Sequence, residues 1–241
     1  MKIYKNIIFL LVFLCSLSTA VCAAPEVSEQ LDLIADHADV WSLSYDFNLP
    51  WGYTVTDLDH NGRYEIISAS VQGTGFYTDI KIFEVSEDGT SLNEVGQDRP
   101  DYDSAPDIMT DRVKVFHDAD AGRFYYIFTD MIRNGYAEFY ENKRAVRLED
   151  GVWKETALAY KSVLFSDPEH STESYKDASG AEITEEAYLT AEDDYFNNIQ
   201  PEEFCPGWQM TDTETFPGIT REALRASLEA SASPECPEHL K

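Results

Sequence analysis

One nine-residue segment, Asp57-Leu58-Asp59-His60-Asn61-Gly62-Arg63-Tyr64-Glu65, constrains the fold more than any other part of the chain. It places oxygen-bearing side chains at loop positions 1, 3, 5 and 9, with a glycine at position 6. Calcium takes six to eight oxygen ligands, and alternate side chains of a tight loop can converge on one point. Gly62 permits the sharp backbone turn that this convergence needs. The predicted calcium ligands are four side chains and one backbone carbonyl: Asp57, Asp59, Asn61 and Glu65, with the carbonyl of Arg63.

The residues that follow the loop distinguish it from a helix–loop–helix site. Ile66 to Val71 is mostly apolar and reads as a β-strand. An EF-hand would need a bidentate glutamate at position 12, where this chain has Ser68, and a helix after it. The sequence therefore predicts a calcium loop that leads into a strand.

The pattern Asp-x-Asp-x-Asn-Gly-x-x-Glu before an apolar strand resembles the calcium loop of FG-GAP/VCBS-type repeats, which form the blades of integrin-like β-propellers. It is also similar to single loops of this kind in secreted bacterial proteins. The resemblance is limited to Asp57–Val71, and the Phe-Gly…Gly-Ala-Pro part of the repeat is missing. It implies a calcium-stabilised β-structure and no particular activity. The alternative interpretation is an Asx/Gly turn that binds no ion.

A complete propeller is not expected, because it needs several blades of four strands and the chain has no internal repeat. Asp118-Ala119-Asp120-Ala121-Gly122 looks like a second calcium loop. It is one residue short before its glycine, and Tyr126 stands where the position-9 acid should be. We therefore interpret it as an ordinary hairpin turn.

The apolar spacing of the rest of the chain predicts an α+β fold. An N-terminal helix is indicated by one apolar face, with Ser28 as the expected N-cap. The residues of this face are Leu31, Ile34, Ala35, Ala38 and Trp41. Alternating segments then predict an antiparallel β-meander of about six strands. The expected strands are 51–55, 66–71, 76–85, 124–132, 136–148 and 152–165, with Asn134-Gly135 and Asp150-Gly151 as hairpin turns.

The two ends of the chain differ in character from this β-rich centre. Lys2 and Lys5, the apolar run Ile7 to Leu14 and the small-residue site at Val21-Cys22-Ala23 predict a signal peptide cleaved after Ala23. Lipoprotein processing at Cys22 is the alternative. The predicted organisation is a signal peptide at 1–23, a β-rich domain with the calcium loop at 24–165, and an acidic helical segment at 166–241.

The C-terminal segment is expected to hold two helices, Thr184 to Asn197 and Thr220 to Ser231. Cys205 and Cys236 are the two cysteines that remain after cleavage of the signal peptide, and in an exported chain they predict one disulfide. Such a bridge would close a loop across the second helix and stabilise the fold by roughly 3–4 kcal/mol.

The charge and the missing motifs limit the function. A formal net charge of −27 repels nucleic acids and anionic membranes, and no segment after the signal peptide is long and apolar enough to span a bilayer. The HExxH, Gly-x-Ser-x-Gly and phosphate-loop patterns are all absent from the sequence. The strand aromatics could bind a sugar, although a core or cross-strand role is the simpler interpretation. These aromatics are Tyr77, Tyr125, Tyr126, Tyr136, Phe139 and Tyr140.

The sequence thus favours an exported, non-catalytic calcium-binding protein, secreted or extracellular, in which the ion orders a loop of a β-sheet. That sheet would serve to bind an extracellular glycan or protein. The alternative is a secreted hydrolase of glycan or peptide that uses paired carboxylates, which would have to lie close together in a cleft.

Overall fold

The computed structural model describes residues 24–45, 48–72, 77–98, 107–167, 170–197 and 199–233. Over these ranges the chain is mostly antiparallel β-sheet with a few short helices, as expected for an α+β fold. The predicted signal peptide, residues 1–23, lies outside the described residues.

The first sheet contains the loop segment and has the strand order β12-β1-β2-β3-β4, with every neighbouring pair antiparallel. Its strands are β1 (Pro50–Thr56), β2 (Glu65–Gln72), β3 (Tyr77–Val85), β4 (Leu92–Glu94) and β12 (Gln209–Asp212). The last of these comes from the far end of the chain and pairs with β1. One edge strand of the sheet is therefore supplied by a segment more than 150 residues further along the chain than β1.

The second sheet has the order β10-β9-β8-β7-β6-β11, and the short β5 pairs in parallel with the start of β9. Its strands are β5 (Gly96–Asp98), β6 (Val113–Asp118), β7 (Arg123–Asn134), β8 (Glu138–Glu149), β9 (Val152–Asp167), β10 (His170–Asp177) and β11 (Glu202–Phe204). The strands from β6 to β10 form a meander of hairpins. The structure thus divides the strands between two sheets, where the sequence predicts one meander of about six.

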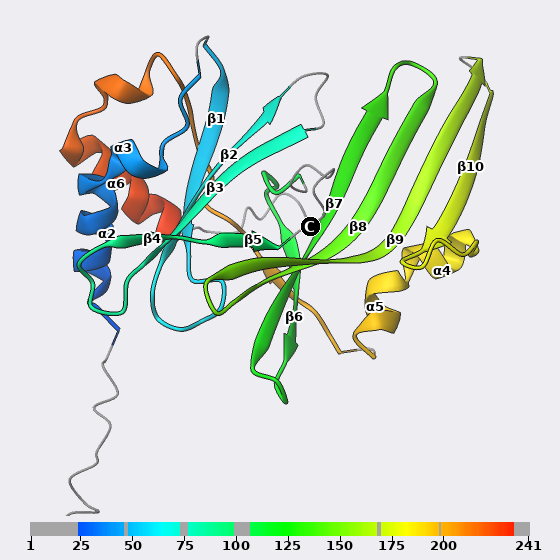
Figure 1. Ribbon diagram of the computed structural model, residues 1–241, viewed down its shortest axis with the longest axis horizontal. Helices are drawn as coiled ribbons and strands as arrows, with labels where there is room; N and C mark the ends of the chain where they lie inside the picture. The colour runs from blue at the N-terminus through cyan, green and yellow to red at the C-terminus, as the bar shows by residue number, and fades with distance from the viewer. Residues whose placement is uncertain are drawn as a thin grey trace, which may run out of the picture.

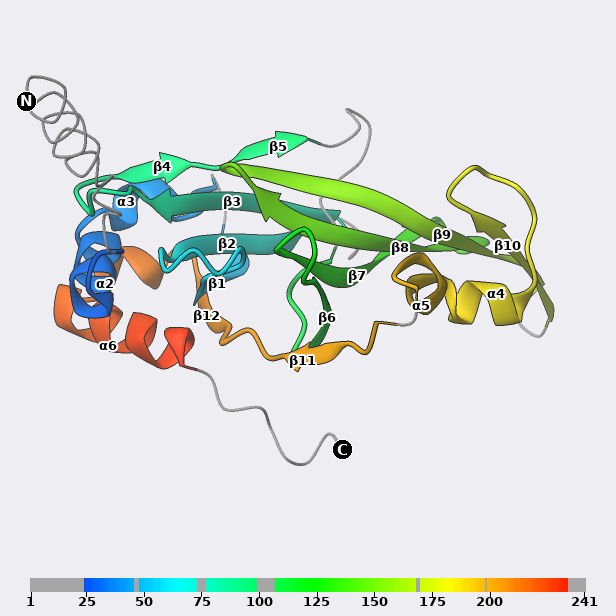
Figure 2. The same ribbon diagram turned by 90° about the horizontal axis from the view of Figure 1, so that it is seen from below.

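Helices cover the outer faces of the two sheets. The helices are α2 (Val27–Asp36), α3 (Ala38–Trp41), α4 (Glu185–Leu189), α5 (Ala191–Tyr195) and α6 (Arg221–Ala232), with a 3-10 turn at Phe216–Gly218. Figure 1 shows α2, α3 and α6 together beside the first sheet, and α4 and α5 at the opposite end beside β9 and β10. Figure 2 shows the same arrangement from below, with both sheets between the two groups of helices.

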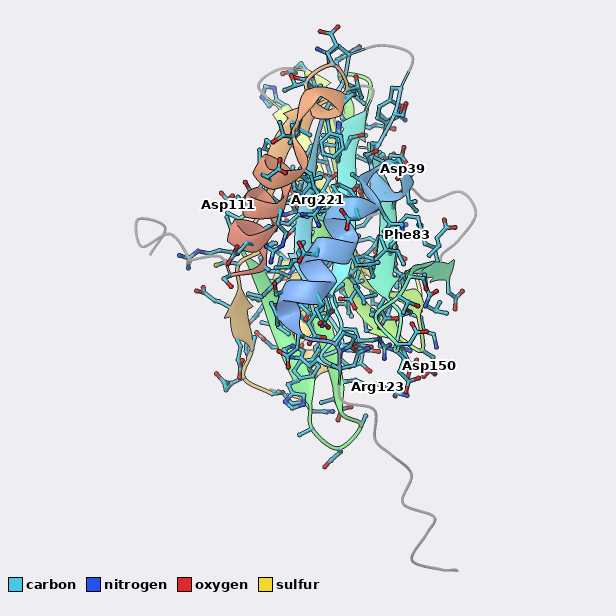
Figure 3. All side chains as sticks on the ribbon, turned by 90° about the vertical axis from the view of Figure 1, so that its left-hand side faces the viewer. Asp39, Phe83, Asp111, Arg123, Asp150 and Arg221 are labelled. Atoms are coloured by element: carbon cyan, nitrogen blue, oxygen red, sulfur yellow. The ribbon has the colours of Figure 1, made fainter. Side chains whose placement is uncertain are left out.

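Ion pairs connect α2 and α6, two of the helices beside the first sheet. Arg221 of α6 forms ion pairs with Asp32 and Asp36 of α2, and Arg225 pairs with Asp32. Figure 3 views this side of the molecule, with Arg221 labelled where α6 faces α2. These pairs are largely exposed, so most of the stability of the helical layer comes from the apolar face beneath it.

That apolar face holds a cluster of four large aromatic rings. Trp41 lies with its ring centroid 6.3 Å from Trp51, 5.3 Å from Tyr53 and 5.4 Å from Phe216. The indole N–H of Trp41 donates to the carbonyl of Ile34, so its single polar group is satisfied inside the core. The residues of the predicted N-terminal helix face pack into this core, but the single helix that was expected is broken at His37 into α2 and α3. It also begins after Glu26 and not at a Ser28 cap.

A second core fills the space between the two sheets. It is made of aliphatic and aromatic side chains from both sheets and from the loops between their strands. Its buried members include Leu58, Ile67, Ile80, Ile82, Val115, Tyr126, Phe128, Val146, Leu148 and Trp153. Because the first sheet has this core on one face and the helices on the other, β1 is buried on both faces from Trp51 to Thr56. A small apolar cavity of about 20 Å³ remains in this core.

The C-terminal region, predicted as an acidic helical segment at 166–241, contributes three strands to the sheets besides its helices. The helix expected from Thr184 to Asn197 is two short helices with a break at Thr190. Glu192 lies at the start of α5 and pairs with Lys143 and Lys114, which anchors this helix to the outer face of the second sheet. The helix expected from Thr220 is α6, capped by the Thr220 side chain.

Candidate metal centre

The predicted calcium loop is the turn of the β1–β2 hairpin. The last ladder pair before the turn joins Thr56 to Glu65, so the loop runs from Asp57 to Tyr64. Two residues of the turn have a left-handed backbone, His60 with φ of 57° and Gly62 with φ of 85°. A Cβ atom on Gly62 would also lie 2.9 Å from the Cβ of Ala24, so both conformation and space favour glycine there.

Three of the predicted ligands come together. Asp57, Asp59 and Glu65 each offer one carboxylate oxygen, and these atoms lie within 4.8 Å of one another. Glu65 is 0% exposed, and its Oε2 accepts a hydrogen bond of 2.7 Å from the backbone N–H of Leu58. Its Oε1 is buried and has no hydrogen-bond partner within the described part of the chain. This group of three carboxylates could hold a metal ion.

The surroundings of these carboxylates disfavour their charged forms. Burial raises the pKa of Glu65 well above the usual 4.5, and the nearby Asp59, Asp57 and Glu84 raise it further. Burial also raises the pKa of Asp57 and the pKa of Asp59, and for Asp59 the charge of Glu84 adds to the effect. Negative charge is thus concentrated in a poorly hydrated place, which is the situation that a bound cation relieves.

Asn61 and Arg63, the other two predicted ligands, lie in the same turn with different contacts. The backbone N–H of Asn61 donates to Oδ1 of Asp57 at 2.9 Å, and the N–H of Gly62 donates to Oδ2 of the same carboxylate at 3.0 Å. The Asn61 amide nitrogen donates to Oδ2 of Asp59 at 3.0 Å. Ligation by Asn61 would need its Oδ1 turned toward the carboxylates, whereas here that oxygen accepts from the N–H of Arg63.

A fourth carboxylate adjoins the cluster, and the sequence interpretation missed it. Glu84 of β3 stands directly opposite Glu65 in the β2–β3 ladder and is only 6% exposed. Its Oε1 accepts from the Asn61 amide nitrogen at 2.7 Å and pairs with the Arg63 guanidinium at 2.5 Å. A signal for it was present, since Glu84 continues the strand face occupied by Ile80 and Ile82 and is therefore an acid at a core-facing position.

Two side chains from other layers hold the loop in place. Gln30 of α2, 1% exposed, donates to the carbonyl of Gly62 at 2.9 Å and accepts from the N–H of Tyr64 at 2.7 Å. From the second sheet, the hydroxyl of Tyr126 donates to the carbonyl of Leu58 at 3.0 Å. The loop is therefore fixed by the helices on one side and by the opposite sheet on the other. Gln30 was detectable in the sequence as a polar residue four positions before Ile34 on the apolar helix face.

The remaining predicted features have simple roles. The ring of His60, at loop position 4, stacks on Phe124 with the ring centroids 3.8 Å apart, and Phe124 also stacks on His117. The Asp118–Gly122 segment is the β6–β7 hairpin turn, as expected, with the N–H of Ala121 donating to Asp118.

The aromatic side chains that were considered as a sugar-binding surface do not form one group. Tyr126 is buried in the core between the sheets, while Tyr136 at the tip of the β7–β8 hairpin is 86% exposed. Tyr125 packs against Phe196, which belongs to a small core on the outer face of the second sheet. The sugar-binding interpretation therefore gains no support from their arrangement.

Of the two predicted disulfide partners, Cys205 is buried and is disulfide-bonded. Cys236 lies outside the described residues, so the pairing of these two cysteines stays a prediction. Among the helices that the structure describes, none is long and apolar enough to cross a membrane. Comparisons of the chain with known protein families, with curated proteins and with solved structures found no match.

Proposed function

We propose that this is an exported, non-catalytic calcium-binding protein in which the ion orders the β1–β2 loop and thereby stabilises the two-sheet core. One observation carries the proposal, namely the buried Oε1 of Glu65, which has no hydrogen-bond partner among the described residues and lies beside Asp57 and Asp59. A buried carboxylate oxygen without a partner is costly, and a cation at the convergence of the three carboxylates removes that cost.

The donor set favours a hard divalent cation such as calcium. Asp57, Asp59 and Glu65 offer carboxylate oxygens, and the turn can add the Asn61 side-chain oxygen and the Arg63 carbonyl. Zinc sites prefer cysteine sulfur and histidine nitrogen, whereas the ligand atoms that converge here all belong to carboxylates. Calcium also tolerates the irregular geometry of a hairpin loop better than magnesium does. These features support the resemblance to FG-GAP/VCBS-type calcium loops as an interpretation of this segment.

The competing proposal, a hydrolase with paired carboxylates, fits this cluster less well. A general acid or nucleophile must reach its substrate. Glu65, however, is fully buried, and its Oε2 already accepts a hydrogen bond from the backbone N–H of Leu58. Raised pKa values alone do not distinguish an enzyme from an ion site, because both concentrate buried charge. We therefore favour a binding protein, whose ordered sheet would present a surface to an extracellular glycan or protein.

Differential scanning calorimetry in calcium and in chelator tests this proposal. Extracellular calcium modules bind with Kd of about 10⁻⁴–10⁻³ M, and calcium at ten times Kd should raise the unfolding free energy by about 1.4 kcal/mol. We expect this rise in the wild-type protein and none in Asp57→Ala. Asp120→Ala, which removes an acid from the β6–β7 turn, is the matched control and should keep the full calcium response. An equal melting temperature in millimolar calcium and in chelator would contradict the proposal.

A further inference from the structure

We infer that Glu84 is a fourth carboxylate of the cation site and that Arg63 is its built-in competitor, so that the two together set the affinity of the site. This inference rests on the proposed cation binding by Asp57, Asp59 and Glu65. It assigns a role to two residues that the loop pattern does not include as side chains. A divalent cation and the Arg63 guanidinium would be alternative partners of the Glu84 carboxylate.

The placement of Glu84 follows from the strand register. Glu65 and Glu84 are Cα partners in the antiparallel β2–β3 ladder, so their side chains stand next to each other on the same face. Like charges directly opposite each other are destabilising, and both of these side chains are buried. Such a pair is tolerated when positive charge lies close by, and Arg63 supplies it for Glu84 at 2.5 Å.

The link between Glu84 and the other carboxylates passes through Asn61. One nitrogen, Nδ2 of Asn61, donates both to Oδ2 of Asp59 and to Oε1 of Glu84. For Asn61 to bind a cation, its amide must turn so that the oxygen faces the ion. Glu84 would then lose the Asn61 donor, and its carboxylate would become available to the cation. Turning this one amide therefore exchanges a hydrogen-bonded arrangement for a coordinating one.

Arg63 is suited to the role of a displaceable partner. Arg63 belongs to the loop itself, and its side chain is 26% exposed while its Nε is buried, so the guanidinium lies at the border between the core and solvent. The Glu84 side chain, 8% exposed, is more deeply buried. A cation that binds Oε1 of Glu84, the oxygen that shares the Asn61 donor with Asp59, must displace Arg63 from that oxygen. That displacement weakens binding by the free energy of the ion pair.

A double-mutant cycle measured by isothermal titration calorimetry with calcium chloride tests the inference. Glu84→Gln keeps the size and an acceptor oxygen, and it should weaken calcium binding at least about fivefold. Arg63→Met keeps the apolar stem, and it should tighten binding by a similar factor. In the double variant the tightening should disappear, because Arg63 acts through Glu84. Circular dichroism melting in chelator checks that each variant is folded.

The control separates competition from a general change of charge. Arg133→Met removes a positive charge from β7 about 30 Å along the strand from Phe124, which contacts the loop, and it should leave the affinity unchanged. If Arg63→Met tightens calcium binding equally with and without Glu84, Arg63 does not compete with calcium for Glu84. Its positive charge then affects the site only through long-range electrostatics. Unchanged affinities in all variants would overturn the inference and leave the proposed function standing. No calcium binding by the wild-type protein would overturn both.

Discussion

Replacing Glu65 with glutamine is expected to stabilise the protein in chelator and to abolish its response to calcium. The glutamine oxygen can still accept from the N–H of Leu58, while its amide nitrogen can donate toward Asp57 and Asp59. The change thus removes a buried, unpartnered carboxylate oxygen and adds a donor among acceptors. The unfolding free energy should rise by about 1–3 kcal/mol, the usual cost of an unsatisfied buried polar group.

The size of this gain should depend on pH in a defined direction. Burial raises the pKa of Glu65 in the folded protein well above its usual 4.5. A carboxyl group with a raised folded pKa contributes stability that is complete below the unfolded pKa and is lost as pH rises through the folded value. The wild-type protein in chelator should therefore lose stability from this group as pH rises above about 4.5, and the advantage of Glu65→Gln should grow.

Urea denaturation of both proteins in chelator and in calcium, at several pH values, measures the effect. Glu94→Gln, at an exposed position of β4, is the matched control for the loss of one acidic charge and should change stability little. A glutamine variant that is less stable than the wild type in chelator would mean that Glu65 has a partner that this account does not include.

Replacing Trp41 with alanine should lower the unfolding free energy by about 3–5 kcal/mol, the range for deleting a large aromatic side chain from a core. Trp41 is fully buried and touches Trp51, Tyr53 and Phe216, so its removal leaves a cavity beneath the helical layer. Because Gln30 holds the calcium loop from the same layer, calcium affinity should fall as well.

Val40→Ala is the matched control for this change, since Val40 is the neighbouring residue and is 38% exposed. Its effect on the unfolding free energy should stay within about 0.5 kcal/mol, as for most surface substitutions. Chemical denaturation in chelator gives both values. A loss below about 1 kcal/mol for Trp41→Ala would show that the helical layer is not part of the cooperative core.

Local features of this fold were predictable from the sequence because they depend on residues close together in the chain. The β1–β2 turn is encoded by Gly62 and by Asp57, which accepts from the turn's N–H groups. The β7–β8 and β8–β9 turns are encoded by Asn134-Gly135 and Asp150-Gly151. The same holds for the apolar face of the N-terminal helix. In each case a short pattern determines both the backbone path and the side that is buried.

The arrangement of the strands into two sheets was not predictable in this way. Strand β12 pairs with β1 across more than 150 residues, and β11 pairs with β6, yet both are only three or four residues long and lack a clear alternating pattern. Thr54 and Thr56 look like outward-facing residues, but they are buried because a second sheet covers that face. Such burial depends on tertiary packing, which overrides local polarity.

The candidate site was likewise predictable only where it depends on residues close together in the chain. The three carboxylates that converge were identifiable because they lie within nine residues of one another. Glu84 joins them through strand pairing, and Gln30 reaches the loop from a helix that precedes it by more than twenty residues. Contacts made by tertiary structure supply the second half of the site, and a linear pattern does not contain them.

The most direct test of cation binding is a crystal structure of the wild-type protein grown in calcium, with anomalous diffraction data collected at long wavelength. We expect an anomalous peak about 2.3–2.6 Å from carboxylate oxygens of Asp57, Asp59 and Glu65, with the Asn61 side-chain oxygen turned toward it. Well-defined density for the loop with no peak there, and with the Asn61 amide nitrogen still directed at Asp59, would show that these carboxylates do not bind calcium.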